Sequence, residues 1–112
     1  MIDARQFNIR DSEGHLLCPA CGFPSFADED AYDERGGLVG ITICPCCLWE
    51  PGFDDGHYAS AAARETILES LRAYRAGWNG RPEWRGRAAE RPPTWDGERQ
   101  LSHLLEVAPY VR

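Results

Sequence analysis

Lysine is absent from this sequence, and all 12 of its basic residues are arginine. We attribute this bias, together with the abundant alanine, glycine and proline, to genome composition rather than to a need for guanidinium chemistry. A run of about 20 apolar residues, which a membrane-spanning helix requires, is also missing. No basic stretch followed by an apolar one marks a secretory signal in the sequence as given. These absences predict a cytoplasmic protein that does not enter a membrane.

Large aliphatic side chains are scarce as well. Leu, Ile, Val and Phe together account for 21 of 112 residues, which is close to the composition of chains that stay unfolded. Four Trp and four Tyr compensate in part, because each aromatic ring buries a large area. A single domain of this length therefore has a small hydrophobic core and needs an additional stabilising element, such as a bound metal ion. The length also excludes a large active-site architecture.

The charge is negative overall and unevenly distributed. The formal net charge is −6. Residues 1–60 hold eleven acidic residues against three arginines, a net charge of −8, whereas residues 61–112 hold nine arginines against seven acidic residues, a net charge of +2. Because the acidic half repels a phosphate backbone, nucleic acid is not the first partner that we expect.

The five cysteines fall into two groups whose spacing is typical of a zinc ribbon. The first group runs Cys-Pro-Ala-Cys, and after 22 intervening residues the second runs Cys-Pro-Cys-Cys. Two thiolates at this spacing on a tight turn both reach one ion at about 2.3 Å, and two such turns complete a tetrahedron. We therefore predict a bound Zn²⁺, with Cys46 left as a spare buried thiol. The predicted ligands are Cys18, Cys21, Cys44 and Cys47.

Other interpretations of the cysteines remain open. Structural disulfides would suit a secreted chain, but the cysteine count is odd. A thioredoxin-like redox pair would need a βαβ context, which the sequence does not indicate. Cys44 could pair with Cys46 in a tighter Cys-x-Cys arrangement, or His57 could replace one thiolate as a ligand.

A site of four thiolates is coordinatively closed, and this bears on function. It leaves no position for water, so zinc in such a site neither generates hydroxide nor polarises a substrate. The metal then contributes folding free energy, on the order of 10 kcal/mol in small zinc modules. We therefore do not expect an enzyme.

Short strands are predicted around the two cysteine groups. Residues 38–43 are apolar and β-branched, and they lead directly into Cys44. Residues 22–26 are a second candidate strand. The alternation of Phe7 and Ile9 indicates a third, near the start of the chain.

Two helices are predicted in the second half of the chain. The first begins near Ser60 and stops at Gly77, because apolar residues recur between them at helical spacing. The second covers residues 96–107, where three leucines share one face. The predicted fold is α+β, a small zinc ribbon of short antiparallel strands and two cysteine turns packed against one or two helices. The expected stripe of the first helix is Ala63, Ile67, Leu71, Tyr74 and Trp78.

The cysteine motifs also carry a family resemblance. The stretches Cys-Pro-Ala-Cys-Gly-Phe from Cys18 and Ile-Cys-Pro-Cys-Cys-Leu-Trp-Glu from Ile43 resemble the bacterial cysteine-rich CPCC domain family over residues 16–78. This chain departs from the family pattern in two ways. The family usually has the inner cysteine in the first turn, where this chain has Ala20. In the family the acidic pair directly follows Trp-Glu, whereas here three residues separate them. The resemblance implies a bacterial, zinc-binding protein and no particular biochemical activity. It divides the chain into a zinc-ribbon-like domain (1–78) and a linker with a short C-terminal helical segment (79–112).

The basic stretch between residues 72 and 91 is the main candidate for partner binding. Six arginines are interleaved there with two tryptophans and two glutamates, a net charge of +4. Arginine and aromatic side chains are enriched at protein–protein hot spots, and they also bind single-stranded nucleic acid. We predict a non-enzymatic protein-interaction domain. A nucleic-acid-binding ribbon using the same stretch is the alternative, and intramolecular packing over the acidic half is a third role. The candidate residues are Arg81, Trp84, Arg85 and Arg87.

Two acidic regions complete the candidates. Residues 27–37 carry five acids and are expected to be a solvated connection, with an acidic docking face as the alternative. Glu50, Asp54 and Asp55 follow the second cysteine group, together with His57. A catalytic role would make His57 a general base, and thiol redox chemistry is the other activity left open. We expect these residues instead to form hydrogen bonds around the metal and to cap the following helix.

Overall fold

The computed structural model describes residues 3–55, 63–78 and 81–112, with the side chains of residues 63–66 left aside. The described part is a small α+β structure of two short antiparallel strands, two α-helices and three turns of 3₁₀-helix. This confirms the α+β class and both predicted helices. The elements, in chain order, are η1 (Ala4–Phe7), β1 (Ile9–Arg10), β2 (Leu16–Leu17), α1 (Ala63–Ala76), η2 (Ala88–Glu90), α2 (Gly97–Val107) and η3 (Pro109–Val111).

The two strands form a hairpin that leads into the first pair of cysteines. Ile9 lies opposite Leu17, and Arg10 lies opposite Leu16. Residues 11–15 close the hairpin through two backbone hydrogen bonds, from the N–H of Asp11 to the carbonyl oxygen of His15 and from the N–H of Gly14 to the carbonyl oxygen of Asp11. Because β2 ends at Leu17, the hairpin fixes the position of the next residue, which is the first cysteine.

The strand predicted at residues 38–43 does not form, and that prediction is wrong. Gly40 has a left-handed φ of 79°, so the chain turns within the segment. Thr42 points inward because its Oγ1 donates a hydrogen bond of 2.7 Å to the carbonyl oxygen of Phe26. The apolar side chains of the segment consequently point outward, and the exposed ones are Val39, Ile41 and Ile43.

The strand predicted at residues 22–26 is also wrong as an element. What forms there is a single bridge between Leu17 and Pro24. Ser25 has a φ of 58°, which lies outside the extended region, so the pairing stops after one residue.

Both helices follow the periodicity of their apolar residues. In α1, Ile67 and Leu71 are buried, and Trp78 is buried just beyond the helix end. The predicted N-cap, Ser60, lies outside the described residues. Asp96 precedes α2, and its Oδ1 accepts a hydrogen bond of 3.1 Å from the backbone N–H of Arg99, as a helix N-cap does.

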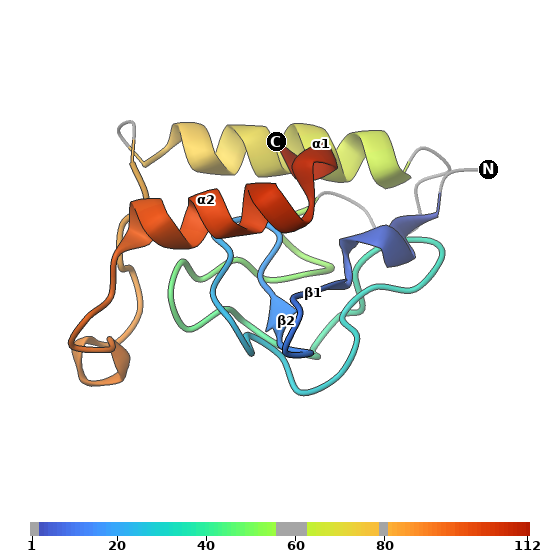
Figure 1. The fold of residues 1–112 in the computed structure, drawn as a ribbon. Coiled ribbons are helices and arrows are strands. Elements are labelled where there is room, and N and C mark those ends of the chain that lie inside the picture. The colour runs from blue at the N-terminus through green and yellow to red at the C-terminus, as the bar shows by residue number, and fades with distance from the viewer. Residues whose placement is uncertain (1–2, 56–62, 79–80) are drawn as a thin grey trace.

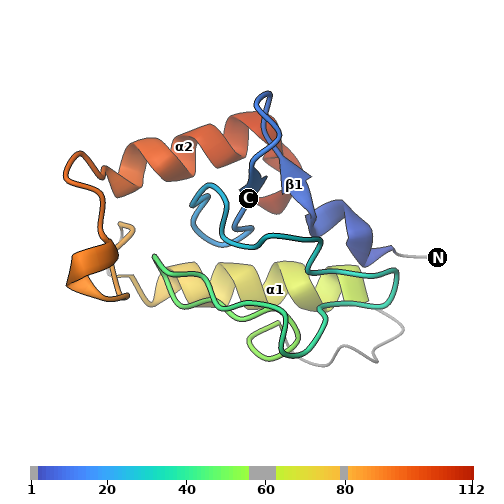
Figure 2. The same ribbon diagram turned by 90° about the horizontal axis from the view of Figure 1, so that it is seen from below.

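The helices lie on one side of the molecule and run in opposite directions (Figure 1). Seen from below, the chain around residue 20 lies between them (Figure 2). Hydrogen bonds agree with this view, because side chains from both helices reach the backbone of residues 19–21. Neither described helix has the length and apolar character needed to cross a membrane.

The core is built around the cysteines. All five cysteines are fully buried, as is Trp49. The Trp49 indole donates a hydrogen bond of 3.0 Å to the Tyr32 hydroxyl and lies edge-on to the Tyr74 ring, with the centroids 5.0 Å apart. Trp49 thus belongs to the same buried cluster as the five cysteines.

Candidate metal centre

The first cysteine turn, residues 18–23, is closed by two backbone hydrogen bonds. The N–H of Gly22 donates to the carbonyl oxygen of Cys18 at 2.7 Å, and the N–H of Cys18 donates to the carbonyl oxygen of Phe23 at 3.1 Å. Gly22 has a φ of 86°, a left-handed conformation that glycine adopts readily. The turn brings the two thiols of the first pair to the same side.

The second cysteine turn, residues 44–49, repeats this backbone pattern. The N–H of Leu48 donates to the carbonyl oxygen of Cys44 at 2.9 Å, and the N–H of Cys44 donates to the carbonyl oxygen of Trp49 at 2.9 Å. Leu48 occupies the position of Gly22 and has a φ of 69°. A side chain in this conformation costs about 1–2 kcal/mol, so the second turn is the more strained of the two.

The two turns bring four thiols together. The Sγ atoms of the four predicted ligands all lie within 4.8 Å of one another and are buried. Cys18 and Cys47 are 3.8 Å apart at Sγ, and Cys21 and Cys44 are 3.7 Å apart. Metal–sulfur bonds of about 2.3 Å place the ligands of a tetrahedral site about 3.8 Å apart, so the thiols fit a single tetrahedral ion.

The fifth thiol takes a different position. Cys46 is buried but is not one of the four thiols that converge. Its Sγ accepts a contact of 3.6 Å from the side-chain amide of Gln100. His57, the other alternative ligand, lies outside the described residues.

Burial controls the ionisation of these thiols. It raises the pKa of Cys18 and of Cys44, and it raises the pKa of Cys21 well above the ordinary value, with hydrogen bonds from neighbouring thiols adding to the effect. These three thiols are therefore protonated at neutral pH unless a cation stabilises their thiolates. A divalent ion supplies that stabilisation, and its binding releases protons.

Side chains from α1 donate hydrogen bonds to backbone carbonyl groups of both cysteine turns. The Arg75 guanidinium donates to the carbonyl oxygens of Ala20 at 2.8 Å and Pro19 at 2.6 Å, and it also reaches that of Val111 at 2.6 Å. The Tyr74 hydroxyl donates to the carbonyl oxygen of Cys47 at 2.6 Å. The sequence pattern placed Arg75 in a basic surface stretch, whereas the structure uses it to join the first cysteine turn to the C-terminus.

Helix α2 holds the first turn from the opposite side. The side-chain amide of Gln100 donates to the carbonyl oxygen of Cys21 at 3.1 Å. A Cβ atom on Gly22 would lie 2.7 Å from the carbonyl oxygen of Gln100 and 2.9 Å from the Cβ of Leu104. The sequence analysis missed Gln100, and the one available signal was its position one helical turn before Leu104.

The four candidate partner-binding residues divide into two kinds. Trp84 packs edge-on against Phe23 and Trp95, with centroids 5.6 Å apart in both pairs. The backbone N–H of Arg85 donates to the carbonyl oxygen of Cys46 at 2.7 Å, and its guanidinium lies over the Tyr74 ring. Trp84 thus packs its segment against the first cysteine turn, and Arg85 docks the same segment on the second.

The remaining two, Arg81 and Arg87, are exposed. Among the residues that the structure describes, no ion pair joins the stretch 72–91 to an acidic side chain. Intramolecular packing was one of the three roles predicted for this stretch, and the stretch does pack within the molecule. Its contacts are hydrogen bonds to carbonyl groups and packing of aromatic rings rather than ion pairs.

The acidic residues after the second turn close a further turn. Asp54 accepts a hydrogen bond of 2.7 Å from the backbone N–H of Glu50, and Asp55 accepts one of 3.0 Å from that of Gly52. Asp55 is buried, which raises the pKa of its carboxyl group. These carboxylates thus accept from backbone N–H groups of residues 50–55 and stabilise that turn.

No protein-family model matches the chain, and searches of curated proteins and of solved structures find no match either. The resemblance to the CPCC family therefore stays a prediction based on the cysteine motifs. The argument for a metal centre depends on the arrangement of the four thiols.

Proposed function

We propose that the four converging thiols bind one Zn²⁺ in a closed, structural site. The observation that carries the proposal is the pair of Sγ–Sγ distances, 3.7 and 3.8 Å, which match the edges of a tetrahedron around one ion. Tetrahedral sulfur sites hold zinc or iron, and two turns of this kind are typical of zinc ribbons. We also propose that the chain is a zinc-ribbon-like bacterial protein of the CPCC type.

The metal's role in this proposal is to stabilise the fold. The described regular strands are two residues long, and the core is centred on the cysteines. Without a metal the core would hold five buried thiols and few large aliphatic groups. Zinc binding adds on the order of 10 kcal/mol to such a fold. Because four thiolates leave no open position, we propose a non-enzymatic role, in a reducing compartment such as the cytoplasm.

The biochemical role that we propose is binding another protein. The support is an exposed apolar face, defined here as Val39, Ile41, Ile43, Leu48 and Phe53. Val39 is 65% exposed and Phe53 is 74% exposed. The two segments adjoin, because a Cβ on Gly52 would lie 3.0 Å from the backbone nitrogen of Val39. Exposed apolar side chains on adjoining segments, such as those of Val39 and Phe53, are typical of interaction surfaces.

The basic stretch is the competing surface. A nucleic-acid-binding role would use Arg81 and Arg87, since Trp84 and Arg85 have partners within the molecule. Two exposed arginines on a chain with a net charge of −6 offer little attraction to a phosphate backbone.

Two double variants compare these surfaces in one experiment. Val39→Asp with Phe53→Asp alters the apolar face, and Arg81→Ala with Arg87→Ala alters the basic stretch. Lysate of the source organism, with and without nuclease treatment, is passed over each immobilised variant, and bound proteins are quantified by mass spectrometry. We expect a protein that the wild type and the arginine variant retain equally and that the aspartate variant loses. Zinc content checks that both variants are folded.

The opposite pattern would contradict the proposal. If the aspartate variant retains every bound protein, the apolar face is not the binding surface. If binding instead requires nucleic acid, falls steeply with salt and is lost in the arginine variant, the nucleic-acid role takes its place.

A further inference from the structure

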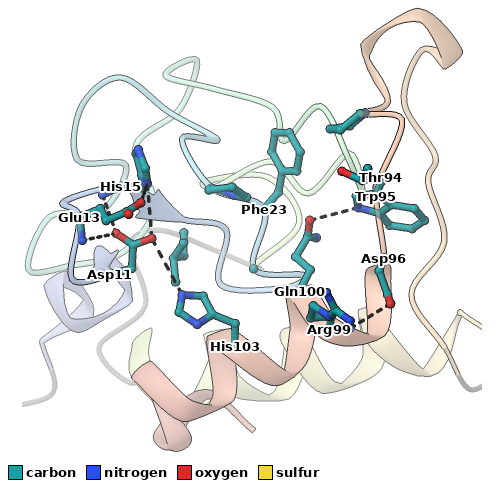
Figure 3. Close-up of a pocket in the computed structure, with 14 residues that line it drawn as sticks. Asp11, Glu13, His15, Phe23, Thr94, Trp95, Asp96, Arg99, Gln100 and His103 are labelled. Atoms are coloured by element: carbon teal, nitrogen blue, oxygen red, sulfur yellow. Dashed lines mark hydrogen bonds and ion pairs between the residues drawn. The ribbon is translucent and has the colours of Figure 1, made fainter.

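A cavity of about 400 Å³ lies beside the first cysteine turn, between the turn that closes the β1–β2 hairpin and helix α2 (Figure 3). Trp95 and Gln100 line one end, and Phe23 lies near the middle. At the other end the hairpin turn and α2 bring two histidines to either side of a carboxylate. This cluster is distinct from the four thiols, and the proposed function makes no use of it.

The histidine nitrogens and carboxylate oxygens are at ligand spacing. Asp11 Oδ2 lies 3.4 Å from His15 Nδ1 and 3.9 Å from His103 Nε2. His15 Nδ1 also lies 3.5 Å from Glu13 Oε2. Metal–nitrogen and metal–oxygen bonds of about 2.1 Å place tetrahedral ligands about 3.4 Å apart. The ligand atoms of Asp11, Glu13 and His15 all lie within 4.8 Å of one another. His103 lies outside this group of three and approaches Asp11 alone, so its side chain has to move toward His15 to reach the same ion.

The local structure prepares the carboxylate for this role. Asp11 Oδ1 accepts hydrogen bonds from the backbone N–H groups of Glu13 at 3.0 Å and His15 at 2.9 Å. These bonds fix the side chain, which is only 9% exposed, and leave Oδ2 facing the two imidazoles. The carboxylate is thus oriented before any ion arrives.

The second histidine comes from a different element that is also fixed. His103 lies on α2, three residues after Gln100, so the two share a face of the helix. Gln100 is tied to the carbonyl oxygen of Cys21, and this contact sets the position of α2 against the first cysteine turn. The cluster therefore combines ligands from two elements that the cysteine turn already holds together.

We propose that His15, His103 and Asp11, with Glu13 as a fourth ligand, bind a second divalent transition-metal ion. Two neutral imidazoles with carboxylates suit ions such as Zn²⁺, Ni²⁺ and Fe²⁺ rather than Mg²⁺ or Ca²⁺. The side chains of His15 and His103 are 45% and 50% exposed, so the site is open to solvent, unlike the four-thiolate centre. Because Glu13 is 76% exposed, water or a small ligand in the cavity can displace it as the fourth ligand, and the ion is exchangeable.

Titration of the one-zinc protein with Zn²⁺ tests this inference. We expect isothermal titration calorimetry to detect one further equivalent, and native mass spectrometry to detect two zinc ions per chain. His15→Ala and His103→Ala each lower the affinity for the added ion at least tenfold and leave the first ion bound. Asp11→Asn keeps the Oδ1 acceptor of the turn and is expected to weaken the added ion similarly.

The third histidine of the chain provides the matched control. His57→Ala is expected to bind the second ion as the wild type does. The inference is overturned if the titration ends at one equivalent, if the second equivalent persists unchanged in His103→Ala, or if His57→Ala loses it equally. Retention of the first zinc in every variant separates these outcomes from failure of the four-thiolate centre.

Discussion

The two cysteine turns have the same hydrogen-bonded backbone but different neighbours. In the first turn the left-handed position is Gly22, and the backbone of α2 lies directly against it. In the second turn the same position is Leu48, whose side chain is exposed. Thiol spacing and one left-handed residue are therefore enough to shape such a turn. What packs on the turn decides whether that residue has to be glycine.

The inner residues of the turns differ in a related way. The carbonyl group of Ala20 is held by the Arg75 side chain of α1. The carbonyl group of Cys46 accepts backbone N–H groups from Arg85 and Gly86. The inner residue of one turn is thus fixed by a helix side chain and that of the other by the backbone of an extended segment, although both turns present two thiols to the same point.

The largest effect is expected from removing a thiol of either turn. Cys18→Ser and Cys47→Ser should each lose the metal and with it cooperative folding, because about 10 kcal/mol of binding free energy supports a thin core. Zinc content and thermal unfolding followed by circular dichroism measure this. Equal losses from both turns would show that their four thiols act as one site. A variant that unfolds cooperatively without zinc would show that the core does not need the ion.

A smaller effect separates the helix contact from backbone strain in the first turn. Gly14 has a φ of 83° and, unlike Gly22, has open space around it. Gly14→Ala should cost about 1 kcal/mol of unfolding free energy, and Gly22→Ala about 3 kcal/mol or more, because only the second forces α2 away. Urea unfolding of both variants compares them. Equal costs would mean that α2 does not restrict Gly22.

The carbonyl clamp of the first turn should rank next. Arg75→Ala removes three hydrogen bonds to partly buried carbonyl groups, and we expect it to lower the unfolding free energy by about 2–3 kcal/mol. Arg72→Ala, which removes one exposed bond to the carbonyl oxygen of Arg112, should cost less than about 0.5 kcal/mol. Urea unfolding at matched zinc occupancy measures both. Similar values for the two would contradict the clamp.

The smallest effect concerns strain in the second turn. Leu48→Gly should raise the unfolding free energy by up to about 1 kcal/mol, because glycine relieves the left-handed conformation and little buried area is lost. Leu48→Ala keeps the strain and should give no gain. Thermal unfolding of the two zinc-loaded variants distinguishes them, and a loss of stability in Leu48→Gly would show that the leucine side chain has a packing role.

Cysteine spacing and apolar periodicity were sufficient to predict the thiols that converge and the two helices, since both signals are local. The predicted strand at residues 38–43 failed because the chain turns at Gly40, whose φ of 79° is left-handed, and the apolar pattern of the segment does not encode that turn. Arg75 and Gln100 meet the first turn across 55 and 79 residues of chain, and no local pattern encodes such contacts. No local pattern predicts the approach of the hairpin turn and His103 either.

Native mass spectrometry of the protein purified without chelator, beside the same sample after acid release, tests the central claim most directly. We expect one zinc ion per chain in the native spectrum and, after release, a chain mass with all five cysteines reduced. A metal-free chain lighter by about 2 or 4 Da would contradict the zinc centre, because it would show that the converging thiols are oxidised in pairs.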